Sequence, residues 1–347
     1  MKFPLADWID SHTGYRHDLA RSGMAGSIRR PSLSVSEHRA TDAEELRTEL
    51  AASIGVAPER VFLTHGATES NAWVLLYIGR SLGRRVGTCR IALPEYPPLV
   101  DGPRMAGFEV GEQDGPSDLA VLSQPRNPEG DEWSADRLFE WASGARHLLV
   151  DETFREFGDR RSLATLPRER LWATGSFTKF YAGDDLRVGF VIAPETDEKA
   201  FARFWGLFAD ELPPTSVAGA LSALRHRPRI HEEVRRMMST HRRVLARAFD
   251  LSTPPVAPVW FDRIGPRAPE LVDRLLRASV LVCPGSFFGE PAGVRLCLTR
   301  RTFPADLAAY LAVRGPAGAP GLRSARVPTR AVRPRRGASA RARAGPG

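Results

Sequence analysis

The chain has 347 residues, of which 42% are hydrophobic and 26% charged, as in folded globular proteins of one large domain or two. These values exclude a mini-protein, and no apolar run approaches the ~18 residues that a membrane helix requires. A net charge of +8 would ordinarily indicate an anionic partner, but nine Arg and no acidic residue lie in residues 314–347. The remaining residues carry 40 basic and 41 acidic groups, so neither nucleic acid nor a membrane is expected as a partner.

Regular structure is predicted to begin after an N-terminal segment, residues 1–40. A capping box from Thr41 to Glu44 opens a helix whose apolar residues recur on one face. Short apolar runs then predict strands at residues 61–64, 90–93, 119–123, 147–151, 172–175 and 187–193. Helices are predicted between strands at residues 66–77 and 134–142. Strands that alternate with helices favour a mostly parallel sheet.

The second half of the chain predicts a long polar helix at residues 229–249 and then a smaller α/β unit. That unit has strands at residues 280–282 and 294–298 and a helix at residues 304–312. The tail consists mainly of Gly, Pro, Ala and Arg, so it cannot bury enough surface to order itself. The expected fold class is α/β: a three-layer sandwich with a mostly parallel sheet, plus a smaller α/β domain. The expected units are residues 41–250, residues 251–313 and a disordered tail at residues 314–347.

One lysine stands out because lysine is rare in this chain. Only Lys2, Lys179 and Lys199 are present, against 46 Arg. Such a composition is typical of a GC-rich genome, which replaces lysine by arginine wherever the chemistry allows. Lys179 ends the sequence Ser-Phe-Thr-Lys, directly after a predicted buried strand. An amine can form a Schiff base once its pKa is lowered, whereas a guanidinium cannot. Lys179 is therefore a candidate nucleophile; the alternative is a surface lysine in a turn.

Three further sites follow predicted strands, where ligands usually bind in parallel sheets. Asp151 ends an apolar strand, and its carboxylate could hold a cofactor's ring nitrogen protonated, cap a helix or pair with a cation. Ala67 and Thr68 open a helix, so free backbone N–H groups there could cradle a phosphate or belong to an ordinary turn. Asn127 lies between Arg126 and a proline, where a type I turn is the plain alternative.

Taken together, the order and placement of these residues resemble the fold-type I pyridoxal-phosphate enzymes of the class I/II aminotransferase group. The likeness covers about residues 40–313. It is strongest in Ser-Phe-Thr-Lys at residues 176–179 and in Arg-Val-Gly-Phe at residues 187–190. The resemblance implies pyridoxal 5'-phosphate as the cofactor, bound by the larger domain.

Carried over position by position, the resemblance implies two catalytic residues: Lys179 as the Schiff-base lysine and Asp151 as the partner of the pyridine nitrogen. It places Tyr96 against the cofactor ring and Asn127 at its phenolic oxygen, and it assigns the substrate α-carboxylate to Arg295. Without the resemblance, Tyr96 could equally be a core residue and Arg295 a surface residue. The cofactor phosphate would be bound by Ala67, Thr68, Ser176, Thr178 and Arg187.

The chain departs from the family pattern in three places near this site, the mildest being Thr178, which replaces a common serine and keeps the hydroxyl. The family commonly has tyrosine where this chain has Phe154, which cannot donate a hydrogen bond to the cofactor. Phenylalanine there is similar to the threonine-phosphate decarboxylase and capreomycidine synthase branches. Arg126 replaces the usual asparagine before Asn127. The short segment from Pro4 to Trp8, with Asp18 to Gly23 after it, is also similar to the opening of capreomycidine synthase.

The resemblance implies an aminotransferase that acts on an amino acid and a 2-oxo acid, as a homodimer. One alternative is a pyridoxal-phosphate enzyme of specialised metabolism that is not a transaminase, such as a cyclase like capreomycidine synthase, an arginine oxidase or an amino-acid decarboxylase. A lesser alternative is a non-catalytic regulator that binds nucleic acid through the Arg-rich tail.

Two further expectations concern metals and the cellular compartment. The eight histidines show no spacing typical of zinc sites, so no metal is expected. The three cysteines are widely spaced and the N-terminus has no long apolar core, which predicts a cytoplasmic protein without disulfides.

Overall fold

The computed structural model of the chain describes residues 4–28, 41–111 and 115–315. The described residues up to Arg314 group into one compact unit. The side chains of Thr41 and Asp42, which begin the expected capping box, lie outside the described residues, as does the expected disordered tail from residue 316 onward.

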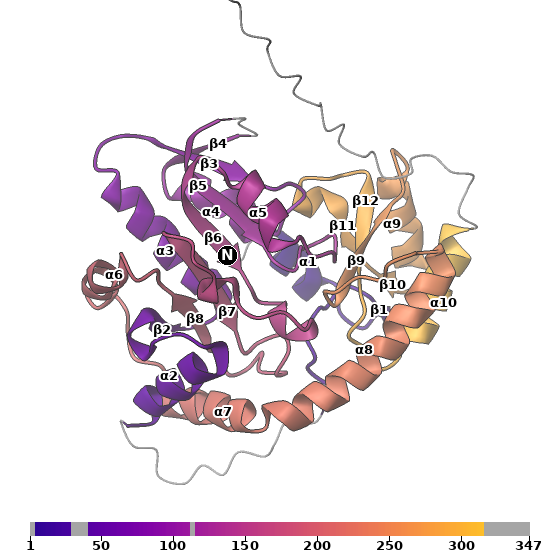
Figure 1. Cartoon of the computed structure of the whole chain (residues 1–347). Helices are drawn as coiled ribbons and strands as arrows, with labels where there is room; N and C mark the ends of the chain where they lie inside the picture. The colour runs from indigo at the N-terminus through magenta and orange to yellow at the C-terminus, as the bar shows by residue number, and fades with distance from the viewer. Residues whose placement is uncertain (1–3, 29–40, 112–114, 316–347) are drawn as a thin grey trace, which may run out of the picture. The chain divides into compact units, whose positions relative to one another are not determined.

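The centre of the fold is a seven-stranded sheet with the strand order β2-β8-β7-β6-β5-β3-β4 (Figure 1). Only β8 runs antiparallel to its neighbours, β2 and β7; every other neighbouring pair is parallel. The expectation of a mostly parallel sheet is therefore confirmed. The strands are β2 (Val61–Thr64), β3 (Gly87–Ile91), β4 (Phe108–Gly111), β5 (Ser117–Ser123), β6 (Ala145–Asp151), β7 (Leu171–Ser176) and β8 (Gly189–Ile192).

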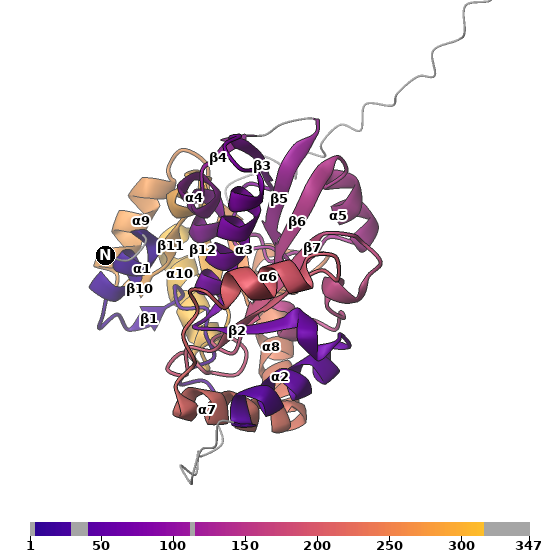
Figure 2. The same cartoon turned by 90° about the vertical axis from the view of Figure 1, so that its left-hand side faces the viewer.

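Helices cover both faces of this sheet, as expected for a three-layer sandwich (Figure 2). Strand β5 shows why: Leu119 and Val121 pack into one hydrophobic cluster, whereas Ala120 and Leu122 pack into another on the opposite face. Each large apolar side chain buried in this way contributes ~1.5–3 kcal/mol to folding. One face is covered by α3 (Ala67–Ser81), α4 (Pro97–Met105) and α6 (Glu198–Trp205). The other is covered by α2 (Thr41–Ile54), α5 (Ala135–Trp141), α7 (Pro214–Arg225) and α8 (Arg227–Phe249).

A smaller antiparallel sheet, with the order β11-β12-β9, follows the long helix α8. Its strands are β9 (Val259–Arg263), β11 (Cys283–Pro284) and β12 (Gly293–Cys297), and its helices are α9 (Ala268–Arg277) and α10 (Phe303–Arg314). The N-terminal segment returns to this part of the chain. After α1 (Pro4–Ser11), β1 (His17–Asp18) pairs in parallel with β10 (Val280–Leu281). The expected domain boundary near residue 250 stays a prediction.

Several expected strand starts differ from the observed ones by up to three residues, and the difference at Arg187 bears on the cavity. Arg187 was expected to begin a strand, but β8 begins two residues later, at Gly189. Arg187 has a φ of +52°, a left-handed conformation that extended strands do not use. A Cβ at Gly189 would lie 2.4 Å from the backbone of Gly66, so only glycine permits this approach of β8 to the start of α3. Arg187 therefore lies in the irregular segment before β8, with its guanidinium beside the start of α3.

None of the described helices is both long and apolar enough to cross a membrane.

Candidate active site

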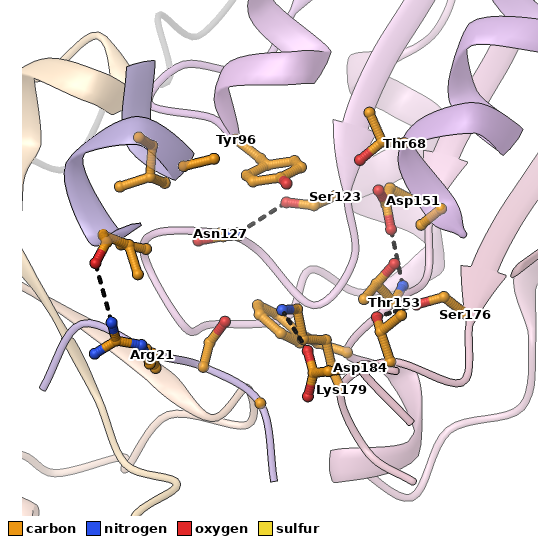
Figure 3. Close-up of a pocket in the computed structure, with 18 of the residues that line it drawn as sticks. Arg21, Thr68, Tyr96, Ser123, Asn127, Asp151, Thr153, Ser176, Lys179 and Asp184 are labelled. Atoms are coloured by element: carbon orange, nitrogen blue, oxygen red, sulfur yellow. Dashed lines mark hydrogen bonds and ion pairs between the residues drawn. The ribbon is translucent and has the colours of Figure 1, made fainter. Parts of the chain in front are cut away.

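A cavity of about 560 Å³ lies at the edge of the large sheet where β5, β6 and β7 end. All ten residues singled out from the sequence line this one cavity, several of them labelled in Figure 3. They are Ala67, Thr68, Tyr96, Asn127, Asp151, Ser176, Thr178, Lys179, Arg187 and Arg295. The carboxyl ends of parallel strands meet at one sheet edge, which explains why residues so far apart in sequence converge.

One end of the cavity has the donors that a phosphate requires. Helix α3 begins at Ala67, so its first backbone N–H groups are free to bind an anion. Gly66 has a φ of +109°, and a Cβ there would lie 2.9 Å from the Arg187 guanidinium, so glycine lets this cation lie over the helix start. The hydroxyls of Ser176 and Thr178 lie 2.7 Å apart at the end of β7. This combination of a helix terminus, a guanidinium and two hydroxyls fits a phosphate monoester.

Asp151 supplies a buried carboxylate on the floor of the cavity. It is the last residue of β6 and is 4% exposed. The amide Nδ2 of Asn71 donates to its Oδ2 at 2.8 Å, and the backbone N–H of Thr153 donates to its Oδ1 at 2.9 Å. Burial raises the pKa of Asp151, and these hydrogen bonds oppose the rise. A cationic ring nitrogen facing this carboxylate would offset its desolvation, which fits the expected cofactor ring.

Lys179 lies in the turn after β7, where its side chain is 31% exposed toward the cavity. Its Nζ is 3.6 Å from Oδ1 of Asp184, a pairing that Figure 3 shows. Its backbone carbonyl accepts a hydrogen bond of 3.0 Å from the N–H of Met24 in the N-terminal segment. Asp184 thus contacts the amine of Lys179 and Met24 holds its backbone, while the amine remains accessible to an aldehyde.

Arg295 on β12 and Asn127 in the loop after β5 form a connected pair in the cavity. Arg295 Nη1 donates to Asn127 Oδ1 at 3.1 Å, and the Asn127 N–H donates to Ser123 Oγ at 2.8 Å. Arg295 is 2% exposed, and its Nε has no hydrogen-bond partner among the described residues. A buried guanidinium with an unpaired N–H beside a cavity fits a substrate carboxylate.

Glu95 and Arg126 are a supporting pair whose role the sequence did not reveal. Both are buried, with 3.9 Å between Arg126 Nε and Glu95 Oε2. Glu95 accepts hydrogen bonds of 2.6 Å from the Tyr96 N–H and from the Ser123 hydroxyl. Burial raises the pKa of Glu95 to about 7, and Arg126 opposes this rise. Arg126, which stands where the family has asparagine, therefore helps to hold the loop that carries Tyr96.

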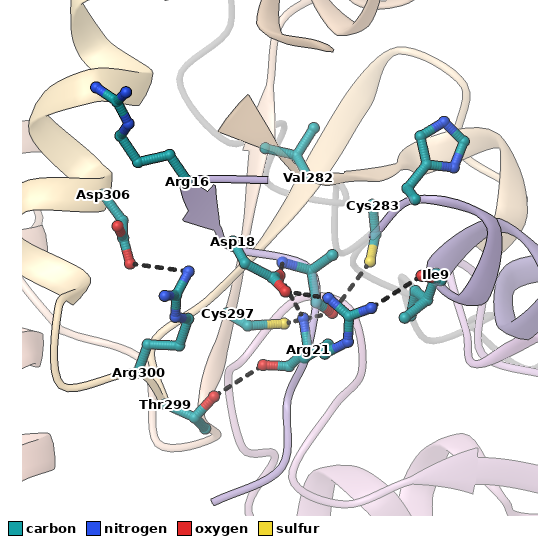
Figure 4. Close-up of polar contacts among 12 residues, drawn as sticks. Ile9, Arg16, Asp18, Arg21, Val282, Cys283, Cys297, Thr299, Arg300 and Asp306 are labelled. Atoms are coloured by element: carbon teal, nitrogen blue, oxygen red, sulfur yellow. Dashed lines mark hydrogen bonds and ion pairs between the residues drawn. The ribbon is translucent and has the colours of Figure 1, made fainter. Parts of the chain in front are cut away.

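The N-terminal segment lines the same cavity, and sequence reasoning assigned it no role in the site. Its lining residues come from α1 and from the stretch after β1: Leu5, Ala6, Ile9, Asp10, Arg21, Ser22, Gly23 and Ala25. Figure 4 shows how the segment is anchored. The Ala20 carbonyl accepts hydrogen bonds from Arg295, Cys283 and Cys297. The Thr299 hydroxyl donates to the Arg21 carbonyl at 2.8 Å.

Phe154, which stands where the family commonly has tyrosine, also lines the cavity and is 5% exposed. It presents only its ring to the cavity, so this position offers no hydrogen bond to a ligand. Among the described residues, no group of three or more His, Cys, Asp or Glu side chains could hold a metal ion.

The chain is similar in sequence to known proteins over most of its length. Residues 110–304, more than half of the chain, match the family model described as aminotransferase class I and II. The threonine-phosphate decarboxylase of Pseudomonas aeruginosa is 28% identical over 322 residues, covering 88% of this chain and 90% of that protein. The aspartate aminotransferase of Thermococcus kodakarensis is 26% identical over 285 residues, covering 79% and 75% respectively.

Solved structures include proteins with a similar fold. A PLP-dependent aminotransferase from Streptococcus suis 89-1591 superposes with a TM-score of 0.72 at 21% identity. The superposition covers 90% of this chain and 97% of that one. At this level of identity the likeness concerns the fold.

Proposed function

Because the chain belongs to the aminotransferase class I and II family, whose members use pyridoxal 5'-phosphate, we propose that it is an aminotransferase that moves an amino group from an amino acid to a 2-oxo acid. The observation that carries the proposal is the convergence of Lys179, Asp151 and Arg295 on one cavity. These supply, respectively, an amine, a buried carboxylate and a buried guanidinium, which are the groups that such a reaction needs.

Some residues of the cavity would bind the cofactor, and others would bind the substrate. When bound, pyridoxal phosphate supplies an aldehyde that condenses with amines and a cationic ring that accepts electrons from a bond broken at Cα. Ala67, Thr68, Ser176, Thr178 and Arg187 would hold its phosphate. Tyr96 would stack on the ring, and Asn127 would donate to its phenolic oxygen. Asp151 would keep the proton on the ring nitrogen.

The substrate is held and deprotonated by two residues. Arg295 would bind the α-carboxylate through a pair of N–H donors and so fix the orientation of Cα. The amine of Lys179, once released by the incoming amino acid, would take the proton from Cα and return it at a different atom, as a general base and then a general acid.

Arg295→Ala is expected to raise KM for the amino acid by about 10- to 100-fold, because a charge-assisted pair of hydrogen bonds is lost. The visible spectrum of the bound cofactor should change little. Steady-state kinetics at several amino-acid concentrations measures the effect. Arg263→Ala is the matched control, since Arg263 lies on β9 of the same small sheet and pairs with Glu129 outside the cavity. An unchanged KM in Arg295→Ala would refute the assignment.

The reaction type is tested by incubating the holoenzyme with a panel of amino acids and following the spectrum and the products by mass. A spectral change that 2-oxoglutarate reverses supports transamination. Release of CO2 or peroxide, or a cyclised product, supports the alternative of a pyridoxal-phosphate decarboxylase, oxidase or cyclase. Phe154 favours that alternative, because the resembling decarboxylase and cyclase branches share phenylalanine at this position.

We also propose that the enzyme is a homodimer. An apolar groove outside the site is lined by Trp73, Leu76 and Phe204, and Phe208 in this groove is 62% exposed. A second copy of the chain would cover these side chains. Sedimentation should give the mass of a dimer, and Phe208→Ser should shift the protein toward the monomer. A fully active wild-type monomer would contradict the proposal.

A further inference from the structure

A buried amide of helix α3 lies against the carboxylate of Asp151. Asn71 is 1% exposed, and the buried residues that follow it on the helix are apolar: Val74, Leu75 and Ile78. The Nδ2 of Asn71 donates a hydrogen bond of 2.8 Å to Oδ2 of Asp151. Asp151 lines the cavity and Asn71 does not. Any effect of Asn71 on the chemistry in the cavity is therefore transmitted through Asp151.

A second buried side chain, Thr174, fixes the direction in which this amide points. Thr174 on β7 is opposite Asp151 on β6 in the parallel register, so the two side chains lie on the same face of the sheet. Leu149 and Trp172, two residues earlier in these strands, pack in the cluster that α3 covers. The Thr174 hydroxyl donates a hydrogen bond of 2.6 Å to Oδ1 of Asn71. Because the amide oxygen is bound there, the amide nitrogen points to Asp151.

This arrangement of donors favours the charged form of Asp151. An amide turned the other way would place its oxygen against Oδ2 of Asp151, and two acceptors can lie so close only when a proton separates them. The other carboxylate oxygen, Oδ1, accepts the backbone N–H of Thr153 at 2.9 Å (Figure 3). Hydrogen bonds donated to a carboxylate stabilise its charge, and they are stronger in a buried site than in water. They oppose the rise that burial causes in the pKa of Asp151.

From this arrangement we propose that Asn71, oriented by Thr174, is a positioning residue that holds the Asp151 carboxylate in the charged form required by a protonated ring nitrogen. This inference rests on the proposed function, which assigns Asp151 to the ring nitrogen of the cofactor. Without the amide, the proton between the ring nitrogen and Asp151 moves to the carboxylate. The ring is then neutral and accepts electrons from Cα less well.

The test removes the two hydrogen bonds one at a time and measures the protonation of the ring nitrogen. Asn71→Leu replaces the amide by an apolar side chain of similar size, and Thr174→Val removes only the hydroxyl donor. Each holoenzyme is prepared with pyridoxal phosphate labelled with ¹⁵N in its ring, and solid-state NMR reports whether this nitrogen carries a proton. The wild type should give the resonance of a protonated ring, and Asp151→Asn that of a neutral one. Asn71→Leu should shift the resonance toward the neutral form, and Thr174→Val should shift it less.

The rate of a single turnover at saturating amino acid should follow the protonation of the ring. Asn71→Leu should lower this rate by about 10- to 100-fold, the value of a hydrogen bond to a charged group. KM for the amino acid should change little, because Arg295 is not altered. The double variant Asn71→Leu/Thr174→Val should lose no more than Asn71→Leu alone, since Thr174 acts through Asn71.

Tyr77→Phe is the matched control, because it removes another hydrogen bond between α3 and a carboxylate. The Tyr77 hydroxyl donates to Oδ1 of Asp197 at 3.1 Å, and neither residue lines the cavity. This variant should keep the ring protonation and the turnover rate of the wild type. Thr174→Ser retains the hydroxyl and should restore most of what Thr174→Val loses. The pair Thr174→Val and Thr174→Ser keeps the inference testable if Asn71→Leu does not fold.

Two results would overturn the inference and leave the proposed function intact. The first is a ring nitrogen that stays fully protonated in Asn71→Leu and Thr174→Val but loses its proton in Asp151→Asn, which would mean that Asn71 only fills space. The second is an equal loss of turnover in Tyr77→Phe and Asn71→Leu, which would indicate a general disturbance of α3. A ring that stays protonated in Asp151→Asn, with unchanged turnover, would instead contradict the role proposed for Asp151, and the inference with it.

Discussion

Replacing Lys179 by alanine is expected to abolish turnover, with a loss of at least about 10⁴-fold. The variant lacks both the nucleophile that fixes the cofactor and the base that acts at Cα, and general acid–base catalysis alone is worth about 10²–10⁴-fold. The yellow colour of the holoenzyme, which arises from the cofactor's bond to the lysine, should also be lost. Absorbance spectra after addition of pyridoxal phosphate and single-turnover assays measure these effects.

The control for this variant is Lys199→Ala, because Lys199 is exposed on α6 and does not line the cavity. It should keep the colour and the turnover of the wild type. Lys179→Arg should behave like Lys179→Ala, since a guanidinium keeps the positive charge but cannot be deprotonated to form the bond. A colourless wild-type protein, or a yellow and active Lys179→Ala variant, would show that the assignment is wrong.

Asp151→Asn is expected to retain part of the cofactor and to lose about 10²–10³-fold in turnover. An amide cannot stabilise a positive ring nitrogen, so the ring becomes a poorer acceptor of electrons from Cα; losing one preorganised electrostatic contact typically has an effect of this size. The amide is close to isosteric with the carboxylate. The hydrogen bond with Asn71 therefore loses the negative charge of its acceptor, while its geometry changes little. Cofactor titration and turnover, measured on the same preparation, separate binding from catalysis.

Asp118→Asn serves as the comparison for this prediction. Asp118 lies near the start of β5, at the opposite edge of the same sheet, where it pairs with Arg85. Loss of the Asp118 carboxylate should change the free energy of unfolding and leave the ratio of turnover to bound cofactor unchanged. Turnover of Asp151→Asn equal to that of the wild type would remove Asp151 from its proposed role.

The core of the site could be predicted from the sequence because its residues follow strands. Asp151 and Ser176 end β6 and β7, and Asn127 follows β5, so parallel pairing alone brings them to one edge. The rarity of lysine drew attention to Lys179 for a chemical reason, since arginine cannot replace a Schiff-base lysine. These predictions require only local sequence patterns and the rule that the carboxyl ends of parallel strands meet at one edge of the sheet.

The parts that could not be predicted depend on contacts between distant segments. The Ala20 carbonyl accepts a hydrogen bond from Arg295 across 275 residues, and the Met24 N–H donates to the backbone of Lys179, so no local pattern near residue 20 predicts these contacts. Asn71 is a buried polar residue of α3, next to the buried Ser70, and such a signal could have been noticed but has many structural explanations. Asp184 looks like an ordinary turn residue until the cavity is seen.

The same long-range contacts bring the N-terminal segment to the cavity. It contributes Asp10 and the apolar residues of α1 to the cavity, and its glycine at position 23 makes room for Asp184. The residues proposed to act on the cofactor come from the large sheet and its loops.

The most direct test of the central claim is to identify the lysine that bonds to the cofactor. The holoenzyme is reduced with borohydride, which converts the carbon–nitrogen double bond to a stable single bond, and the digested peptides are mapped by mass. The chain has only Lys2, Lys179 and Lys199, so the outcome is unambiguous. The pyridoxyl group is predicted on the peptide that contains Lys179. Its presence only on Lys2, Lys199 or the N-terminal amine, or on no peptide, would contradict the account.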